Sequence, residues 1–232
     1  MSSVFIISAP SGSGKSTLVR RLLETVPGLK FSVSYTTRPP RGNEKNGREY
    51  FFVQRTEFEQ MLRNDEFLEH AEVFGYGYGT ARRFLREAEQ HGHDLLLDID
   101  VQGAEQIKRK IPDAVSIFIL PPNRQELEAR LRHRSLDAEK VIQTRLVTAT
   151  REIENYAKYD YILVNDRLED SIEALKSILL AERLKHSGDR NTAAATDTLA
   201  RAECWRLNNV RERLQPILAS FVPEGAMDTK RK

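Results

Sequence analysis

The residues best suited to chemistry stand near the amino end, where two glycines precede a lysine and a hydroxyl residue. The segment reads Ser8-Ala9-Pro10-Ser11-Gly12-Ser13-Gly14-Lys15-Ser16-Thr17. Glycines at these positions let consecutive N–H groups turn toward one anion at the positive end of a helix. Lys15 would add a mobile charge for β- and γ-phosphates, and Ser16 a hydroxyl for Mg²⁺. The pattern predicts a nucleotide phosphate loop formed by Ala9, Pro10, Ser11, Gly12, Ser13, Gly14, Lys15, Ser16 and Thr17.

The surroundings of this loop support the prediction, because an apolar run, Val4–Ile7, precedes it and a helical pattern follows it. One residue departs from the strict pattern, which has glycine where this chain has Ala9. The alternative is a Gly/Ser-rich turn that binds nothing, and the intact Gly14-Lys15-Ser16 run argues against it.

The elements that must position the loop are readable from the spacing of apolar residues. Short apolar runs alternate with segments of helical period, which is typical of a parallel sheet covered by helices. The predicted strands are Val4–Ile7, Leu95–Ile99, Val115–Leu120 and Tyr161–Val164. The predicted helices are Lys15–Thr25, Gln102–Lys110, Arg124–His133, Asp137–Lys158 and Leu168–Lys185. We therefore expect an α/β, P-loop three-layer fold with a parallel sheet core.

The pattern changes between the first helix and Leu95. Phe31–Thr36 and Tyr50–Val53 predict strands, and Pro39–Asn43 predicts a turn-rich loop. We expect residues 34–81 to form an inserted mixed α+β lobe, between core residues 1–33 and 82–186.

Composition restricts the class of protein. The chain has 232 residues, 40% of them hydrophobic, and a formal net charge of +2. This balance argues against nucleic-acid binding, and no apolar run is long enough for a membrane span. A single cysteine, Cys204, excludes an intrachain disulfide. With no leader pattern at the start, we expect a cytoplasmic protein, either a monomer or a homo-oligomer.

The C-terminal residues 187–232 are expected to be an extension of a catalytic body that ends near residue 186. Ser187-Gly188-Asp189 breaks the preceding helix, and the Ala/Thr-rich stretch Thr192–Thr198 is interpreted as a linker. One amphipathic helix is predicted over about Leu199–Phe221. We expect the catalytic body to survive removal of this extension.

A second phosphate site is predicted from Ser34-Tyr35-Thr36-Thr37-Arg38-Pro39-Pro40-Arg41. The two arginines stand beside hydroxyl groups, and the prolines keep the segment extended. Guanidinium groups bind phosphate through paired hydrogen bonds.

With further motifs, the chain resembles the guanylate kinase family from about Val4 to Lys185. These motifs are Gly47-Arg48-Glu49-Tyr50-Phe51-Phe52, Glu69, Tyr78-Gly79-Thr80 and Leu97-Asp98-Ile99-Asp100-Val101-Gln102-Gly103-Ala104. The resemblance implies a phosphotransferase that moves the γ-phosphoryl group of ATP to GMP or dGMP, with Mg²⁺. It implies that Arg38, Arg41, Tyr50 and Tyr78 hold the GMP phosphate, and that Ser34, Glu69, Thr80 and Asp98 read guanine.

Two aspartates end the predicted strand Leu95–Ile99, at the carboxyl edge where ligands bind in such sheets. We assign Asp100, through water, and Ser16 to the Mg²⁺ shell, and Asp98 to the acceptor nucleotide. The reverse assignment of the two aspartates stays open.

The resemblance also implies a helical lid over about residues 130–150. Its arginines, Arg130, Arg134 and Arg145, would reach the transferring phosphates, and we expect Lys15, Arg38, Arg134 and Arg145 to be catalytic. The family's usual Arg-Gly-Thr-Asp run is Arg134-Ser135-Leu136-Asp137 here, a departure expected to stiffen the hinge and to affect the closing rate of the lid more than the chemistry. Two alternatives remain: a non-catalytic interaction module of this fold, and a kinase for another phosphorylated acceptor.

Overall fold

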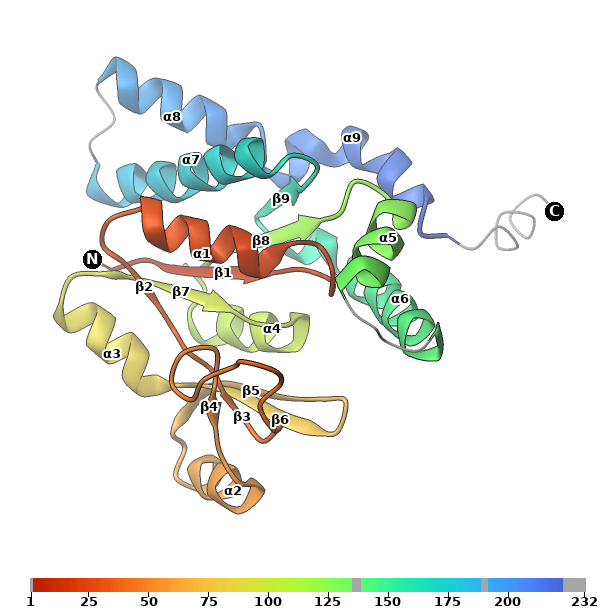
Figure 1. Cartoon of the computed structure of the whole chain (residues 1–232). Helices are drawn as coiled ribbons and strands as arrows, with labels where there is room; N and C mark the ends of the chain where they lie inside the picture. The colour runs from red at the N-terminus through yellow and green to blue at the C-terminus, as the bar shows by residue number, and fades with distance from the viewer. Residues whose placement is uncertain (1, 135–138, 189–191, 223–232) are drawn as a thin grey trace. The chain divides into compact units, whose positions relative to one another are not determined.

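The computed structural model describes residues 2–134, 139–188 and 192–222. Its chain divides into two compact units. The first unit contains the residues up to Ile6 together with Val26–Val115, and the second contains Ile7–Thr25 together with the chain from Ser116 onward. Strand β1 (Val4–Ser8) contributes residues to both (Figure 1).

Five strands are hydrogen-bonded in the order β2-β7-β1-β8-β9. Strand β2 (Leu29–Phe31) runs parallel to β7 (Asp94–Asp98), and β8 (Val115–Leu120) runs parallel to β9 (Tyr161–Val164). All residues of β1 and β8 are buried. Strands buried on both faces need continuous apolar runs, which is what the sequence shows. The predicted α/β fold with a parallel sheet core is confirmed.

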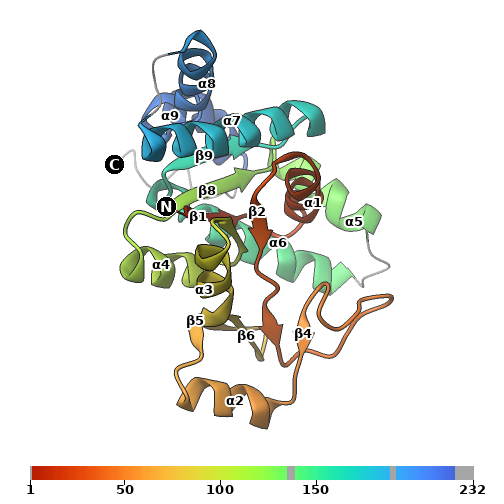
Figure 2. The ribbon, with the colours of Figure 1, turned by 90° about the vertical axis from the view of Figure 1, so that its left-hand side faces the viewer.

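The first unit has a second sheet with the strand order β4-β3-β6-β5. Its strands are β3 (Tyr35–Thr36), β4 (Phe51–Phe52), β5 (Phe67–Val73) and β6 (Tyr76–Ala81). Helix α2 (Arg55–Arg63) packs Phe58 and Met61 against Phe67, and Figure 2 shows it beside these strands. The single strand expected over Phe31–Thr36 is therefore wrong, because the chain passes from one sheet to the other between Phe31 and Tyr35.

Two further helices complete the first unit, α3 (Arg82–Gln90) and α4 (Val101–Lys110). The sequence-based expectations name no element between Val53 and Leu95. Buried Phe84 and Ala88 nevertheless stand one helical turn apart in α3, so the signal for this helix is present in the sequence.

Four of the predicted helices before the C-terminal extension lie in the second unit. Helix α1 (Lys15–Thr25), α5 (Arg124–Arg134) and α7 (Leu168–Ser187) agree with prediction to within about two residues. Helix α6 (Glu139–Ile153) ends earlier than the predicted Lys158, and a short 3₁₀ turn, Tyr156–Lys158, follows it. Asn155 explains the early end, because its side-chain amide donates to the Arg151 carbonyl at 3.0 Å in competition with the helix.

The C-terminal part forms two helices, α8 (Ala193–Glu203) and α9 (Leu207–Ala219), rather than one. The linker interpretation of Thr192–Thr198 is wrong: the Thr192 hydroxyl accepts a hydrogen bond from the Ala195 N–H at 3.1 Å and begins α8. Alanine favours helix, so an Ala/Thr-rich stretch with this cap is helical. Figure 1 shows α8 alongside α7, the helix it contacts.

The break between α8 and α9 is bound to strand β9. The Ile162 N–H donates to the Trp205 carbonyl at 2.9 Å, and the Leu207 N–H donates to the Asp160 carbonyl at 3.1 Å. Strand-like pairing at this point forces the chain out of the helix, which splits the predicted element in two.

A buried polar cluster fixes the same segment. Glu182 is 6% exposed, and its Oε1 accepts hydrogen bonds from the Tyr161 hydroxyl, from Lys185 Nζ at 2.8 Å and from Arg206 Nη2 at 2.9 Å. Burial, with the Glu182 carboxylate, raises the pKa of Tyr161. Arg206 also lies 4.3 Å from the centre of the Tyr161 ring. The C-terminal segment is thus tied to the second unit by paired charges.

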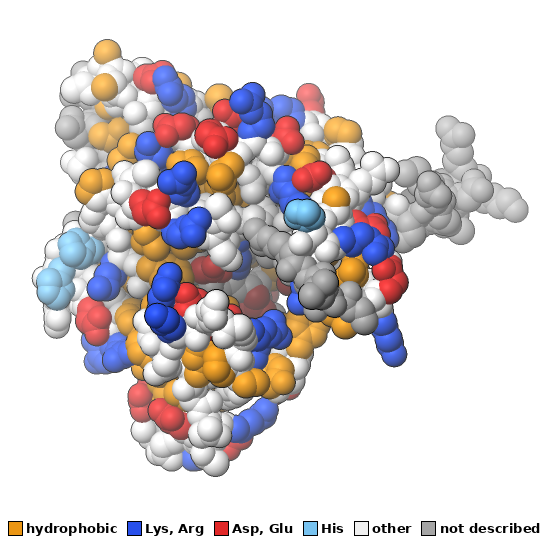
Figure 3. Space-filling model, in the orientation of Figure 1, with side chains coloured by type: hydrophobic (Ala, Val, Ile, Leu, Met, Phe, Trp, Pro, Cys, Tyr) orange, Lys and Arg blue, Asp and Glu red, His pale blue; other side chains and the backbone are white. Residues whose placement is uncertain are grey.

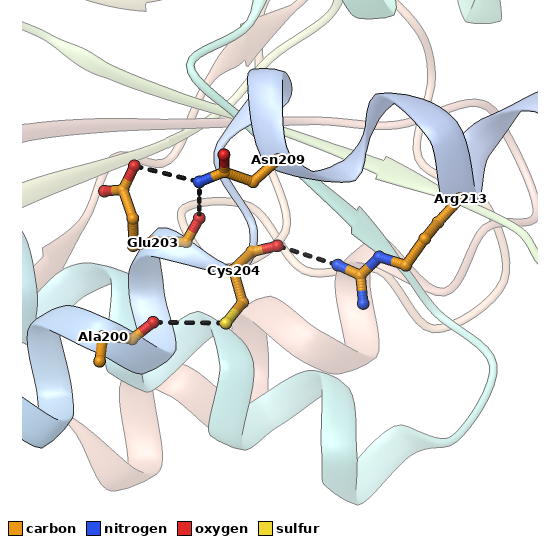
Figure 4. Close-up of a pocket in the computed structure, with 5 residues that line it drawn as sticks. All are labelled: Ala200, Glu203, Cys204, Asn209 and Arg213. Carbon is orange, nitrogen blue, oxygen red and sulfur yellow. Dashed lines mark hydrogen bonds between the residues drawn. The ribbon is translucent and has the colours of Figure 1, made fainter.

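The described surface shows mixed charge. On the face drawn in Figure 3, Lys and Arg side chains are interspersed with Asp and Glu side chains. An open pocket in the C-terminal part is drawn in Figure 4, where polar groups bond to one another: Asn209 donates to Glu203, and Arg213 donates to the Cys204 carbonyl. Among the described residues, no helix is both long and apolar enough to cross a membrane.

Candidate functional site

The predicted phosphate loop joins β1 to α1 in the second unit. Gly12 and Gly14 have φ angles of +91° and +88°, which side chains with a Cβ rarely adopt. The Ser13 N–H donates to the Pro10 carbonyl at 3.1 Å, which closes a tight turn, and α1 begins at Lys15. This geometry is typical of a turn whose backbone N–H groups point toward an anion at the N-terminus of the following helix.

Helix α5 packs against the loop. A Cβ on Gly12 would lie 2.9 Å from Leu127 Cδ1 and 3.0 Å from Leu131 Cδ2. Glycine is therefore required at this position both for its φ angle and for the close approach of two buried leucines.

Asn165 is a residue of this site that the sequence analysis missed. It follows β9, is 6% exposed, and its Nδ2 donates to the Ser13 carbonyl at 2.7 Å. A Cβ on Gly14 would lie 2.4 Å from the same Nδ2. Its position just after the carboxyl end of a predicted parallel strand was the available signal.

The remaining loop residues differ in exposure. Lys15 is half-buried and Ser16 is exposed on the first turn of α1. Ala9, the departure from the strict pattern, is half-buried. Within the described part of the chain, the Ser13 hydroxyl is buried and makes no hydrogen bond.

The expected lid arginines lie on α5 and α6. Arg130 donates through Nε to Glu126 at 2.8 Å and through Nη1 to the Asn165 carbonyl at 3.1 Å. Arg145 is half-buried in α6. Arg134 is the last residue of α5; its side chain, like the Ser135-Leu136 departure, lies outside the described residues.

A buried arginine stands at the centre of the expected second phosphate site, in the first unit. Arg38 is 5% exposed; its Nη2 donates to Glu44 Oε1 at 3.0 Å and its Nη1 to the Pro39 carbonyl at 2.8 Å. Burial opposes the charge of Arg38, but hydrogen bonds with Glu44 and Tyr78 outweigh it and raise the pKa of the guanidinium. Arg38 is thus a buried cation whose charge is balanced in part by Glu44.

Aromatic rings and a turn surround this arginine. The Arg38 guanidinium lies 5.4 Å from the centre of the Tyr50 ring, which meets Tyr78 edge-on at 5.8 Å. Burial, with the nearby charge of Asp98, raises the pKa of Tyr50 to about 12. Arg41 is exposed, and its N–H donates to Glu44 Oε2 at 2.7 Å. Glu44, which was not predicted, therefore bridges the two arginines.

A buried acid and a buried hydroxyl face each other across β5 and β6. Glu69 is 3% exposed, Thr80 is fully buried, and the two are register partners. Burial, reinforced by the negative charge of Asp100, raises the pKa of Glu69 to about 7. Thr80 lies near enough to oppose this shift, and its buried hydroxyl makes no hydrogen bond within the part of the chain that the structure describes.

Gly103 makes room for this acid. A Cβ on Gly103 would lie 2.5 Å from Glu69 Oε2 and 3.3 Å from Asp100 Oδ1. Asp100 begins α4, because its Oδ1 accepts the Gly103 N–H at 2.8 Å. Asp98 and Ser34 are both half-buried, and the Ser34 carbonyl accepts the Phe51 N–H at 2.9 Å. Sequence alone does not reveal the spatial need for Gly103.

These features define a P-loop α/β protein with an anion-binding loop in one unit and a buried arginine and acid in the other. The family model for guanylate kinase matches residues 1–182. A guanylate kinase of Koribacter versatilis is 59% identical over 221 residues, covering 94% of this chain and 95% of that protein. The guanylate kinase of Escherichia coli K12 is 51% identical over 186 residues, covering 79% and 90%.

A solved structure supports the same family. The crystal structure of guanylate kinase from Anaplasma phagocytophilum is similar with a TM-score of 0.66 and 34% identity, covering 93% of this chain and 94% of that one. The chain belongs to the guanylate kinase family and is an ATP:GMP phosphotransferase.

Proposed function

We propose that the phosphate loop of the second unit binds ATP, and that the Arg38 and Glu69 groups of the first unit bind GMP or dGMP. The γ-phosphoryl group then passes to the acceptor phosphate and leaves ADP and GDP. In this proposal residues 34–81 are the acceptor lobe and residues 130–150 the lid of a kinase domain over 1–186, with 187–232 as an extension.

The observation that carries the acceptor assignment is the buried pair of Glu69 and Thr80. Guanine presents N–H donors at N1 and N2 beside the O6 acceptor, so an ionised carboxylate complements that edge and a hydroxyl can serve either kind of group. Adenine has no donor at N1 and would leave the buried carboxylate unsatisfied. Sites that depend on such hydrogen bonds favour the ligand that satisfies them over one that does not by a factor of about 10⁴–10⁵. Ser34 and Asp98 are assigned to the same nucleoside.

The acceptor phosphate would bind at the buried guanidinium. Arg38, Arg41, Tyr50 and Tyr78 supply two cations and two phenol hydroxyls, which suits a dianion. This phosphate has its second pKa near about 6, so it is already largely ionised at neutral pH. The reaction therefore needs no general base, and catalysis depends on position and charge.

The γ-phosphoryl charge that develops during transfer would be stabilised by Lys15, Arg134 and Arg145, with Arg130 supporting the lid. Ser16 fits Mg²⁺ because its exposed hydroxyl offers the oxygen ligand that this ion prefers. We assign Asp100, whose Oδ1 accepts the Gly103 N–H, to the same ion through water. When bound, Mg²⁺ neutralises charge on the β- and γ-phosphates.

The test is ADP release measured with a panel of acceptors: GMP, dGMP, AMP, UMP and ribose phosphates. The proposal predicts turnover with GMP and dGMP and only background with the others. Equal turnover of AMP and GMP would contradict the role of Glu69 and Thr80. ADP release without any acceptor, at the rate seen with GMP, would contradict transfer itself.

A further inference from the structure

Strand β5 of the first unit is irregular immediately before Glu69. Phe67 pairs with Ala81 and Glu69 pairs with Thr80, so β5 has one residue more than β6 over this stretch. The extra residue is Leu68. Such a β-bulge bends a strand and changes where the following side chains point, and bulges are frequent beside active sites.

The bulge accounts for the direction of the Glu69 side chain. In a regular strand, residues two positions apart lie on the same face. Phe67 instead packs in the apolar cluster with α2, whereas Glu69 lies against Gly103 of α4. The extra residue therefore lets an apolar side chain and the acid contact different helices.

Two side chains of α4 bind the backbone of β5 on either side of Glu69. The Gln106 amide accepts a hydrogen bond from the His70 N–H at 3.2 Å and donates to the His70 carbonyl at 2.6 Å. Lys110 Nζ donates to the Leu68 carbonyl, within the bulge, at 2.6 Å. Since β5 is the end strand of its sheet, these bonds take the place of those that a neighbouring strand would make.

The groups of α4 that meet β5 share one face of the helix. Gly103, Gln106 and Lys110 stand three and four residues apart, which is the spacing of neighbours on a helix surface. The helix that leaves room for the Glu69 carboxylate thus also binds the backbone before and after that residue.

We infer that Gln106 and Lys110 are positioning residues for guanine recognition, which hold the β5 bulge so that the Glu69 carboxylate is aimed at the base. They act through Glu69 and do not themselves touch the nucleotide. The inference deepens the proposed function and rests on it, since it assumes that Glu69 binds guanine.

Charge gives Lys110 a second effect on the same acid. Burial is the main reason that the pKa of Glu69 is raised, and the positive charge of Lys110 opposes the rise. Lys110 therefore favours the ionised carboxylate that guanine N–H donors need. Gln106 carries no charge, so its replacement tests position without this effect.

The experiment compares wild type with Gln106→Met, Lys110→Met and the control Lys108→Met, each alone and combined with Glu69→Ala. Methionine favours helix about as well as the residues that it replaces. Lys108 lies on the same helix, and its Nζ donates to two backbone carbonyls beyond α4, so the control also removes hydrogen bonds from a lysine to the backbone. KM for GMP and for ATP, kcat and the melting temperature are measured.

We expect Gln106→Met and Lys110→Met each to raise KM for GMP by about three- to tenfold, the order by which the loss of such hydrogen bonds shifts an equilibrium. The value of kcat at saturating GMP and KM for ATP should stay within about twofold of wild type. Combined with Glu69→Ala, neither substitution should raise KM for GMP further, because both act through a carboxylate that is already removed. The control should match wild type in both KM values.

An equal increase in KM for GMP with and without Glu69 would overturn the inference, because the two residues would then not act through that acid. An unchanged KM for GMP in both methionine variants would overturn it too. Lys110 is exposed, so Lys110→Met decides the outcome if Gln106→Met does not fold. A wild type that does not bind GMP, or Glu69→Ala with the KM of wild type, would instead contradict the proposed function.

Discussion

The two half-sites are built in different ways. The predicted phosphate loop of the second unit relies on backbone geometry within ten consecutive residues, whereas the proposed acceptor side in the first unit relies on buried side chains brought together from distant positions. Arg38, Glu69 and Gly103 come from three different parts of the chain and each is buried. An anion can be bound by a local turn, but the edge of a base is read by groups that only the tertiary fold assembles.

The largest expected effect is a loss of turnover when Lys15 of the predicted phosphate loop is replaced. Lys15→Ala should lower kcat by roughly a hundredfold or more, because it removes a charge that the transition state needs. Steady-state kinetics would measure this, with circular dichroism to show that the variant is folded. Turnover equal to wild type in the folded variant would contradict the catalytic assignment of the lysine.

Arg38→Ala should weaken the binding of GMP without weakening that of ATP. We expect KM for GMP to rise by about thirtyfold or more, because a buried charged partner of the phosphate is removed. KM for ATP should change little. The matched control is Arg48→Ala, whose side chain is 72% exposed and pairs with neighbouring Glu49. Similar increases in both KM values would show that Arg38 does not belong to a separate acceptor site.

A fall in pH should weaken GMP binding through Glu69. In the proposed site Glu69 would have to be ionised to accept the guanine N–H groups, and its pKa is raised to about 7. KM for GMP should therefore rise as pH falls below neutrality, approaching about tenfold per pH unit well below the pKa. Glu69→Gln is the control, since it removes this titration while the GMP phosphate still titrates. An identical pH profile in wild type and in Glu69→Gln would exclude the buried acid as the cause.

A smaller effect is expected from Gly103→Ala. The added methyl group would crowd Glu69 Oε2, so we predict a rise in KM for GMP of about tenfold with ATP unaffected. Gln102→Ala, at the adjacent exposed position, should behave as wild type. If Gly103→Ala also leaves KM for GMP unchanged, the close approach of Glu69 has no part in recognition.

The smallest effect on activity should come from the C-terminal segment. Arg206→Ala should lower the free energy of unfolding by about 1–3 kcal/mol, because buried Glu182 loses one of its two cations. Both KM values should stay near those of wild type. Arg201→Ala, which removes an exposed pair with Asp197, should be near neutral in the same denaturation experiment. Stability unchanged in Arg206→Ala would show that the extension is not fixed by this cluster.

The sequence predicted the two regions unequally for physical reasons. Local features were readable: the buried strands have continuous apolar runs, and the Gly12 to Ser16 spacing fixes a phosphate loop. On the acceptor side, Arg38 and Arg41 were predicted from their own segment, but Glu69 and Thr80 were named through resemblance to a family, because no local pattern places them near Gly103. Asn165 was missed since its role arises from a contact across the fold, and Glu44 was missed although its contacts with Arg38 and Arg41 lie within one short loop. Thr192 could have been recognised in the sequence as the residue that caps a helix, but the stretch that it begins was interpreted as a linker.

The most direct test of two separate half-sites is reciprocal equilibrium titration of Lys15→Ala and Arg38→Ala. We predict that Lys15→Ala binds GMP, and Arg38→Ala binds ATP, each within about twofold of wild type, while each loses affinity for its own nucleotide. Loss of both affinities in either folded variant would contradict the assignment of ATP to one unit and GMP to the other.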